Sequence, residues 1–341
     1  MIEVELIDSR LCALRVALGS REEQGEPQRV LERLVRDGRL DAPTPGGGET
    51  AVRFAMLRSL GRHDLSLARL AEGHLDAHAI LDEAGAERRE GTFGVWAAGP
   101  VEALRAKRSA SGWRLDGIRG WCSGAGNLTH ALVRAAASDG ERLFVVSLDQ
   151  RGITPILGSW PAIGMAATST LDVRFEQVEL PPDEAVGAPG FYLMRKGFWL
   201  GAAGVAAVWL GGSEAIAGVA REHAGDDAHR LAHVGWISAR LGAMESLLRT
   251  TAETIDMVAP DCGTVEYRVR ILRAEIAETA AAILDRTGRA TGAGPLAHDR
   301  EHAQRVADLT LYIRQTHAEA DLEQLGRLEL ALQRGPRQGR R

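Results

Sequence analysis

Residues 120–125 read Gly-Trp-Cys-Ser-Gly-Ala, and they lie inside a region in which apolar and polar residues alternate. Alternation with a period of two is typical of strands, because successive side chains point to opposite faces of a sheet. Asp139-Gly140 separates two such segments and is typical of a tight hairpin turn. Outward from residues 120–125, the same alternation recurs over residues 92–97, 113–118, 131–135, 143–147 and 171–175. The sequence therefore predicts a small β-barrel or sandwich between residues 91 and 185.

Helical periodicity replaces this alternation on both sides. Before residue 91, Leu31, Leu34 and Val35 recur at helical spacing and predict short helices. After residue 185, apolar residues three or four positions apart form ladders over residues 234–248, 269–283 and 306–320. With an apolar segment that precedes them, these ladders predict four helices, which is enough for a bundle. We expect an α+β fold, mainly α, with an N-terminal helical domain (1–90), a middle β-barrel domain (91–185) and a C-terminal four-helix bundle (186–341).

The apolar segment covers residues 197–213, GFWLGAAGVAAVWLGGS, and contains no charged residue. At 17 residues it is short for a membrane span, and its many Gly and Ala residues favour a helix buried inside a bundle. The first residues, from Met1 on, show neither a basic region nor an apolar core typical of a secretory signal. We therefore expect no membrane span and a cytoplasmic location.

Composition excludes several classes of function. Forty-one Lys and Arg residues against 46 Asp and Glu residues give a net charge of −5, which does not favour nucleic-acid binding. Three cysteines lie far apart, so neither a disulfide framework nor a cysteine-based zinc site is expected. Two histidine pairs have the i, i+4 spacing of metal ligands on a helix, but neither has an acidic partner, so no metal site is expected: His74 with His78, and His229 with His233.

From about residue 52 to residue 325, the chain resembles the acyl-CoA dehydrogenase family of flavoproteins. Two segments carry the resemblance best: residues 120–125, and Trp160-x-x-x-Gly-Met-x-x-Thr-Ser-Thr at residues 160–170. The first resembles the family's Trp-x-Ser/Thr strand, which lies along the flavin. The resemblance implies that Trp121, Cys122 and Ser123 bind FAD, with Trp121 near the isoalloxazine ring and Ser123 at its polar edge. Without the resemblance, the same residues are typical of a barrel strand with a buried Trp.

Residues 289–294, Arg-Ala-Thr-Gly-Ala-Gly, resemble a second family motif, a glycine-rich turn between the last two helices of the bundle. In the family this turn approaches the FAD of a neighbouring subunit, and glycine suits such an approach because it has no Cβ. The resemblance thus implies that Arg289, Gly292 and Gly294 bind the cofactor and that the protein is a homodimer or homotetramer. Asp308 lies where the family usually has an Arg-Asp pair, but here Ala307 precedes it. A plain helix–helix turn is the alternative.

The family's reaction oxidises the CH–CH bond of an acyl thioester, usually acyl-CoA, and passes electrons to an accepting partner. It needs a carboxylate base, which many members supply eight residues after the Arg-Asp position and some supply early in the first bundle helix. Here the first position holds Thr316, followed by His317, and the second corresponds to Gly201 and Ala202. His317, on or beside the buried stripe of its predicted helix, is then the candidate acid or base. A packed or surface histidine is the alternative.

Three functions follow from these observations. The first is a flavin-dependent oxidoreductase of the acyl-CoA dehydrogenase type that lacks the usual Glu. The second is a flavin-dependent monooxygenase on the same fold, with His317 near the flavin. The third is a non-catalytic family member that serves assembly or binding, although such a protein has no need to keep the segment from Trp121 to Ser123. Fold does not decide among the three.

Overall fold

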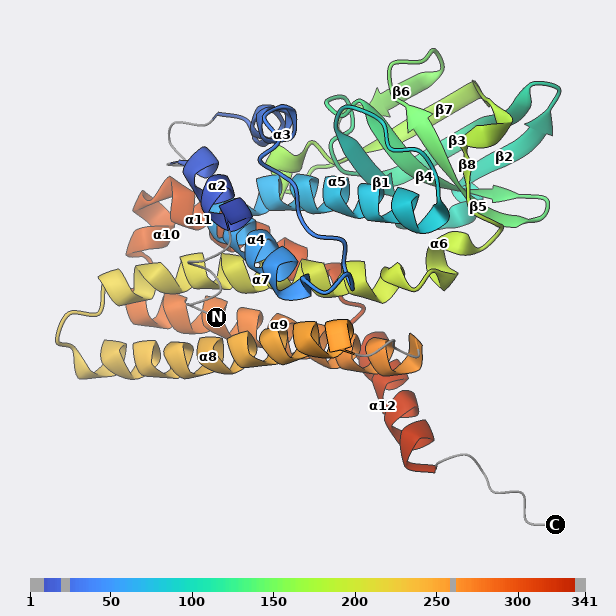
Figure 1. Ribbon diagram of the computed structural model, residues 1–341. Coiled ribbons are helices and arrows are strands. Elements are labelled where there is room, and N and C mark those ends of the chain that lie inside the picture. Colours follow the sequence, from blue (N-terminus) through green and yellow to red (C-terminus); the bar gives the residue numbers. More distant parts are fainter. Residues whose placement is uncertain (1–8, 20–24, 258–261, 335–341) are drawn as a thin grey trace, which may run out of the picture.

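The computed structural model describes residues 9–19, 25–257 and 262–334, so the first residues of the chain, including Met1, lie outside it. Helices precede and follow a central run of strands (Figure 1). The N-terminal helices are α2 (Ser9–Leu18), α3 (Pro27–Arg36), α4 (Thr50–His63) and α5 (Leu65–Ala84). The C-terminal helices are α6 (Phe191–Met194), α7 (Gly197–Glu222), α8 (Ala228–Met257), α9 (Cys262–Thr291), α10 (Gly294–His298), α11 (Arg300–Tyr312) and α12 (Glu319–Arg334). The chain is thus mainly α with one sheet, as predicted, whereas its division into three domains stays a prediction.

The strands form one mixed sheet of eight strands in the order β6-β7-β3-β2-β4-β5-β8, with β1 paired in parallel to β4. Their bounds are β1 (Phe93–Trp96), β2 (Leu104–Ser109), β3 (Gly112–Cys122), β4 (His130–Ala137), β5 (Gly140–Ser147), β6 (Ile153–Ile156), β7 (Leu171–Leu180) and β8 (Ala185–Val186). The hairpin predicted at Asp139-Gly140 is confirmed, since β4 pairs with β5 in antiparallel orientation. Strands β2 and β3 form a second antiparallel pair. The sheet curls around its own apolar core, in which Trp113, Phe144 and Phe175 are buried.

The uncharged segment forms the first part of α7, the central helix of the bundle. This helix is long and apolar enough to span a membrane, but 78% of its most apolar window is buried by the rest of the chain. Glycine explains the close packing: a Cβ on Gly211 would lie 2.0 Å from the carbonyl oxygen of Arg58, and one on Gly61 would lie 2.2 Å from that of Val208. Backbones of α4 and α7 therefore meet directly, and the apolar surface of α7 is used inside the chain.

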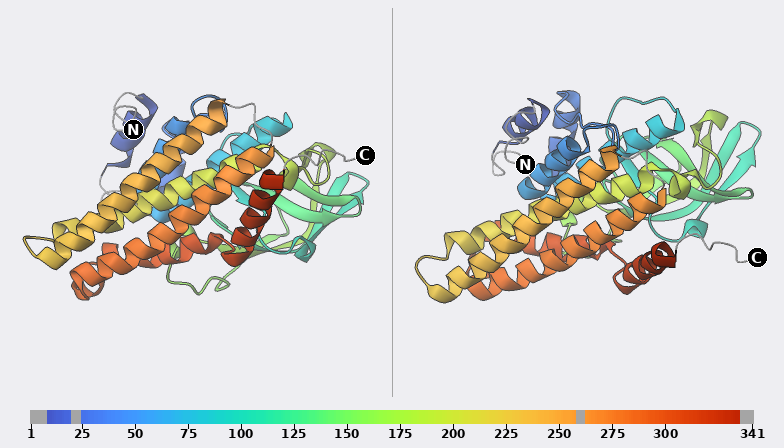
Figure 2. Two further views of the ribbon diagram at one scale, coloured as in Figure 1. Left: turned by 90° about the horizontal axis from the view of Figure 1, so that it is seen from below. Right: turned by 60° about the horizontal axis from the view of Figure 1, so that its bottom comes forward.

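Helices α8 and α9 form a long antiparallel hairpin along one side of α7 (Figure 2). Each buries one stripe, which includes Leu241 and Leu248 of α8 and Leu272 and Ile283 of α9, as the predicted ladders require. The third ladder was predicted to continue to residue 320, and this prediction is wrong. The helix α11 ends at Tyr312, a single 3₁₀ turn follows over Ile313–Gln315, and α12 begins only at Glu319.

One further cluster fixes α5 against the sheet. Ile80 and Leu81 of α5 pack on Phe93 of β1, Leu132 of β4 and Val145 of β5, and all five side chains are buried. Burial of large apolar side chains contributes about 1.5–3 kcal/mol each, so this contact holds α5 firmly beside β1. The helical and β parts of the chain meet along this line.

Candidate functional site

The end of β3 has an unusual backbone conformation. Trp121 has a φ of 62°, in the left-handed region that few residues other than glycine adopt, and its side chain is 57% exposed. Its ring meets the ring of Trp160 edge to face, with 5.3 Å between the centroids. Such backbone strain costs of the order of 1–3 kcal/mol and clusters at binding sites. The structure therefore presents an indole surface to a ligand at this position.

Arg119, two residues before Trp121, holds the neighbouring loop in place. Its side chain is buried and donates hydrogen bonds to the carbonyl oxygens of Ala98, Gly99 (3.2 Å) and Pro100 (3.1 Å). A Cβ on Gly99 would lie 3.6 Å from the Trp121 ring. Burial, with a smaller effect of Arg134, lowers the pKa of Arg119. This buried arginine, which the sequence analysis missed, thus fixes the loop that lies against Trp121.

Ser123 has a hydroxyl that is available to a ligand. Its carbonyl oxygen accepts a hydrogen bond from Nε1 of Trp96 (3.0 Å), and its Oγ accepts one from Thr170 (3.1 Å). Beyond this contact with Thr170, the Ser123 Oγ has no hydrogen-bond partner among the described residues. Nearby, the buried Nε1 of Trp160 has no partner in that part of the chain. One unused donor and a hydroxyl with a single partner therefore lie close to the exposed indole of Trp121, and a flat ring with polar atoms along one edge, such as a flavin, fits this set.

Cys122 has a different orientation from its two neighbours. Its thiol is buried and lies 3.2 Å from the carbonyl oxygen of Arg119, and burial raises its pKa. A raised pKa keeps the thiol protonated and unreactive. The predicted contact of Cys122 with a cofactor is therefore restricted to its backbone.

The loop over residues 160–170 is anchored on α11. The carboxylate of Asp308 accepts hydrogen bonds from the backbone N–H of Met165 (2.6 Å) and from Nε2 of Gln304 (2.7 Å). A Cβ on Gly164 would lie 2.4 Å from the carbonyl oxygen of Ala307, so loop and helix backbones are in contact. Asp308 is buried, and its position in the sequence corresponds to a family motif, but here it fastens a loop of its own chain.

The glycine-rich turn at residues 289–294 does not lie at the end of β3. Gly292 follows α9 and Gly294 begins α10, at the end of the bundle far from the sheet (Figure 1). A Cβ on either glycine would meet nothing within 4 Å, and the Arg289 side chain is exposed beside Asp285 at 3.6 Å. One chain therefore does not bring Arg289, Gly292 and Gly294 together with Trp121. Their role in binding a neighbouring subunit's cofactor stays a prediction.

The expected position of His317 on a buried stripe is wrong. The helix has ended by residue 313, Ala318 has a φ of 42°, and 81% of the His317 side chain is exposed. Its backbone N–H donates to Asp321 (2.9 Å), and its Nδ1 lies 3.8 Å from the same carboxylate. Thr316 uses its hydroxyl to bond the carbonyl oxygen of Ile313 (2.9 Å). A catalytic role for either residue stays a prediction.

The second expected base position, at Gly201 and Ala202, also lacks an acid of its own, but a carboxylate reaches it from α5. A Cβ on Gly201 would lie 2.7 Å from Oδ1 of Asp76. The carboxylate of Asp76 is buried and pairs with Arg195 at 3.1 Å, and Arg195 also pairs with Glu83 at 3.2 Å. No sequence motif pointed to Asp76, because the contact joins residues more than a hundred positions apart.

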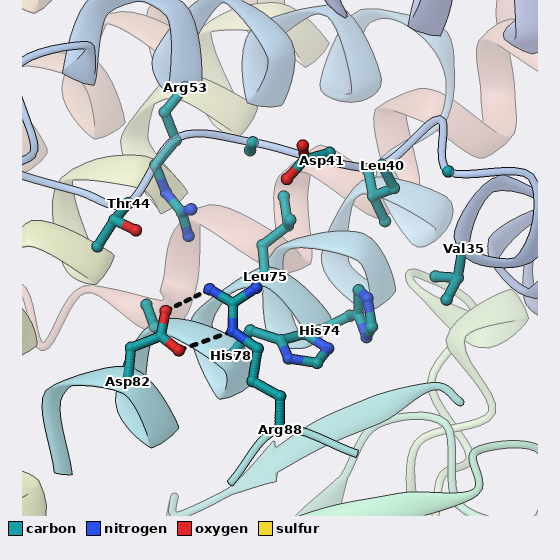
Figure 3. A pocket seen from close by; sticks show the side chains of 13 residues that line it. Val35, Leu40, Asp41, Thr44, Arg53, His74, Leu75, His78, Asp82 and Arg88 are labelled. Atoms are coloured by element: carbon teal, nitrogen blue, oxygen red, sulfur yellow. Dashed lines mark hydrogen bonds and ion pairs between the residues drawn. The ribbon is translucent and has the colours of Figure 1, made fainter. Parts of the chain in front are cut away.

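A cavity of about 200 Å³ opens between α5 and the segment that joins α3 to α4 (Figure 3). Its polar lining includes Arg53 of α4, His74 and His78 of α5, and Asp82 with Arg88, which pair through two hydrogen bonds. His74 and His78 were considered in the sequence only as metal ligands. In the described residues no group of three potential ligands could hold a metal ion.

Comparison with known proteins gives relatives by structure only. No protein-family model and no curated protein sequence matches the chain. Among solved structures, dibenzothiophene monooxygenase TdsC from Paenibacillus sp. A11-2 superposes with a TM-score of 0.83 at 18% identity, over 95% of this chain and 98% of that one. Methanesulfinate monooxygenase MsuC from Pseudomonas fluorescens gives 0.82 at 17% identity, over 96% and 97%. Butyryl-CoA dehydrogenase from Megasphaera elsdenii gives 0.80 at 16% identity, over 95% and 98%. The chain is therefore a divergent protein with the acyl-CoA dehydrogenase fold.

Proposed function

We propose that this chain is a flavin-dependent oxidoreductase whose flavin ring lies against Trp121 and Ser123. The observation that carries the proposal is the strained, exposed indole of Trp121. It lies beside Trp160, whose Nε1 has no partner among the described residues, and two residues before Ser123, whose Oγ is hydrogen-bonded only to Thr170 in that part of the chain. A bound flavin supplies two-electron redox chemistry, which no side chain of the protein provides. A solved structure of TdsC contains FMN, which supports the choice of a flavin.

In this proposal the residues of the chain bind and orient the cofactor. Trp121 and Trp160 form an apolar wall, and the Ser123 hydroxyl donates a hydrogen bond to the acceptor edge of the ring. Arg119 keeps the loop at residues 98–100 beside that wall, and Asp308 keeps the loop at residues 160–170 in place. The side chains of Arg119 and Asp308 are both buried, so the site is organised before a ligand binds.

FMN and FAD share the ring and the first phosphate, and only FAD adds an adenosine. The residues around Trp121 would contact the part that FMN and FAD share. Adenosine binding requires the turn of Arg289, Gly292 and Gly294 from a second subunit, which one chain leaves open to solvent. We propose that FAD is bound where a homodimer or homotetramer forms, and that the isolated chain binds the two flavins alike. The cytoplasm, as expected from the sequence, is the proposed location.

Of the two reactions, we propose monooxygenation of a small molecule. In it, one atom of O₂ enters the substrate and the other leaves as water, with two electrons and two protons supplied by the reduced cofactor. Within the described residues, neither expected base position offers a free carboxylate. The first position holds Thr316, which has no carboxylate, and the carboxylate beside Gly201 belongs to Asp76 and is paired with Arg195. Both oxygens of Asp76 accept hydrogen bonds from Nη2 of Arg195 (3.1 and 3.2 Å), so this carboxylate is already engaged.

Dehydrogenation of an acyl thioester is the second candidate, and a single observation favours it. Asp76 lies where some members of the family place their base, judged by its 2.7 Å distance from the position of a Gly201 Cβ. In this reaction Asp76 takes the α-proton after a substrate has displaced Arg195. The two electrons removed from the substrate would then pass, through the flavin, to an accepting partner protein.

One experiment separates these reactions. The protein, loaded with flavin, is mixed with butyryl-CoA without oxygen, and the visible absorbance is followed. We expect no bleaching, whereas chemically reduced flavin on the protein should be reoxidised by air with consumption of O₂. Bleaching by butyryl-CoA that disappears in Asp76→Asn would select dehydrogenation and overturn the proposed monooxygenation. A protein that binds no flavin would leave only the third function, a non-catalytic member of the fold.

A further inference from the structure

The cavity beside α5 is separate from the end of β3, and β1 connects them. Backbone N–H of Phe93, at the start of β1, donates to Nδ1 of His74 in the cavity wall (3.3 Å). At the other end of β1, Trp96 donates to the carbonyl oxygen of Ser123 (3.0 Å). A strand of four residues spans roughly 10 Å, so the two places are near but distinct. Nothing in the cavity depends on a flavin.

Arg53 contributes a buried positive charge, and no carboxylate of the described residues accepts a hydrogen bond from it. It is 3% exposed, and its Nη1 donates to the carbonyl oxygen of Pro43 (3.1 Å), whereas its Nε and Nη2 have no partner in the same part of the chain. Asp76 and Glu72 act on it from a distance, but each is hydrogen-bonded to another arginine, Arg195 or Arg69. A buried guanidinium with unused donors requires an anion or water, since leaving it unpaired is costly.

His74 presents a second donor. Because Nδ1 accepts the N–H of Phe93, the ring proton resides on Nε2, which has no partner in the described part of the chain. His78 meets His74 edge to face at 4.5 Å, and its buried Nδ1 has no partner there either. Burial, with smaller effects of His78 and Arg88, lowers the pKa of His74 to about 3, so the ring is neutral. A ligand group in this cavity must therefore accept hydrogen bonds from Arg53 and His74.

The rest of the lining limits the ligand's charge and size. Figure 3 shows Arg53 and Arg88 reaching into the same space, with Arg88 paired to Asp82. Asp82 and Asp41 also line the cavity, so a second negative charge on the ligand would be repelled. Val35, Leu40 and Leu75 make the wall partly apolar. A volume of about 200 Å³ has room for about six water molecules or one small organic molecule.

We propose that this cavity binds a small organic monocarboxylic acid, with its carboxylate on Arg53 and His74 and its apolar part against Leu40 and Leu75. The carboxylate accepts hydrogen bonds from Arg53 Nη2 and His74 Nε2, which have no hydrogen-bond partner among the described residues. Arg88 lies more exposed, at the mouth, with its Nε and Nη2 held by Asp82. The cavity thus selects acids over their neutral amides.

Isothermal titration calorimetry on the full chain, without added flavin and in a buffer free of carboxylates, tests this proposal. The probes are benzoate, benzamide and inorganic phosphate. We expect benzoate to bind and benzamide to bind at least tenfold more weakly, because a hydrogen bond to a charged group is worth at least that factor. Phosphate should also bind at least tenfold more weakly, since it brings a second negative charge near Asp41 and Asp82 and has no apolar part for Leu40 and Leu75. Arg53→Gln should weaken benzoate binding at least tenfold. The control, Arg327→Gln on the exposed face of α12, should bind benzoate like the wild type.

Equal binding of benzoate and benzamide, tighter binding of phosphate, no benzoate binding, or unchanged affinity in folded Arg53→Gln would overturn the proposal. If Arg53→Gln fails to fold, the wild type provides a second readout. Benzoate should shift the Nε2 nitrogen resonance of His74 and leave that of the exposed His317 unchanged. An unchanged His74 resonance at saturating benzoate would also overturn it. Neither readout involves flavin, so failure of this proposal can be distinguished from failure of the proposed flavin site.

Discussion

The buried carboxylate of Asp308 on α11 accepts a hydrogen bond of 2.6 Å from the backbone N–H of Met165, in the loop that leads into β7. This contact joins the helical bundle to the loop that carries Trp160 and Thr170. Met165 has a φ of 56° and Ser169 a φ of 47°, so the loop has an unusual backbone that needs such a support. The bundle therefore determines the position of one wall of the proposed flavin site.

Removing this support should loosen the site. In Asp308→Ala, the N–H of Met165 and the amide of Gln304 lose a buried acceptor, which we expect to lower the free energy of unfolding by about 2–4 kcal/mol. Urea denaturation measures this change. Asp308→Asn keeps an oxygen acceptor and should lose less. Asp285→Ala, at an exposed position of α9, is the control and should stay within about 0.5 kcal/mol of the wild type. Equal stability of Asp308→Ala and Asp285→Ala would contradict this account.

The Ser123 hydroxyl should contribute directly to flavin binding. Ser123→Ala removes one hydrogen bond, so we expect flavin affinity to fall by about 1 kcal/mol, or roughly fivefold. Fluorescence titration with FMN measures the affinity. Ser111→Ala, in the turn at the other end of β3, leaves the site intact and should bind FMN like the wild type. Identical affinities for the two variants would remove the reason to place the cofactor at Ser123.

His74 should make stability depend on pH. Its pKa is about 3 in the folded chain, because of burial first and then His78 and Arg88, and about 6.5 in an unfolded chain. The unfolded state binds the extra proton, so this contribution to stability is complete above pH 6.5 and decreases as pH falls toward 3, by up to roughly 5 kcal/mol. Urea denaturation between pH 7 and pH 4.5 should show the decrease. His74→Gln should flatten it and the exposed His317→Gln should not; equal slopes in all three proteins would refute the prediction.

The outer face of α8 suits close packing against a second copy. Small residues recur on it at spacings of three and four, all exposed: Ala232, Gly235, Ala239, Gly242 and Ser246. Such a face lets two helices approach closely. We expect a homodimer or homotetramer in light scattering and a shift toward monomer in Gly242→Arg, with Ser111→Arg as a control that leaves the mass unchanged. A monomer mass for the wild type at micromolar concentration would contradict the proposed oligomer.

Much of the fold could be predicted because its signals are local. The turn Asp139-Gly140 and the alternation around it specify the hairpin of β4 and β5. The uncharged residues 197–213 predict a buried helix, and α7 is one. Periodicity could not show that α11 ends at Tyr312, because the apolar spacing continues through the turn that breaks the helix.

The candidate site was predicted less completely, for a physical reason. Trp121 and Ser123 belong to a short motif, and the structure places them together beside unused donors. Arg119 and Arg53 bond to backbone carbonyl oxygens, so no spacing of residue types reveals them. Asp308 was found through a family motif, but its hydrogen bond to the distant backbone of Met165 was not. Burial of charged side chains depends on the packing of several elements, and single-sequence patterns do not contain that information.

Equilibrium flavin binding tests the central claim most directly. The purified chain is titrated with FMN and FAD while visible absorbance and tryptophan fluorescence are followed. We predict one flavin per chain, a shifted flavin absorbance band and quenched tryptophan emission, because Trp121 lies against the ring. Trp121→Ala should lose most of the quenching and bind more weakly, and Trp236→Ala, a partly buried residue of α8, should retain both. Absence of any spectral change at millimolar flavin, or equal binding by Trp121→Ala and wild type, would contradict the account.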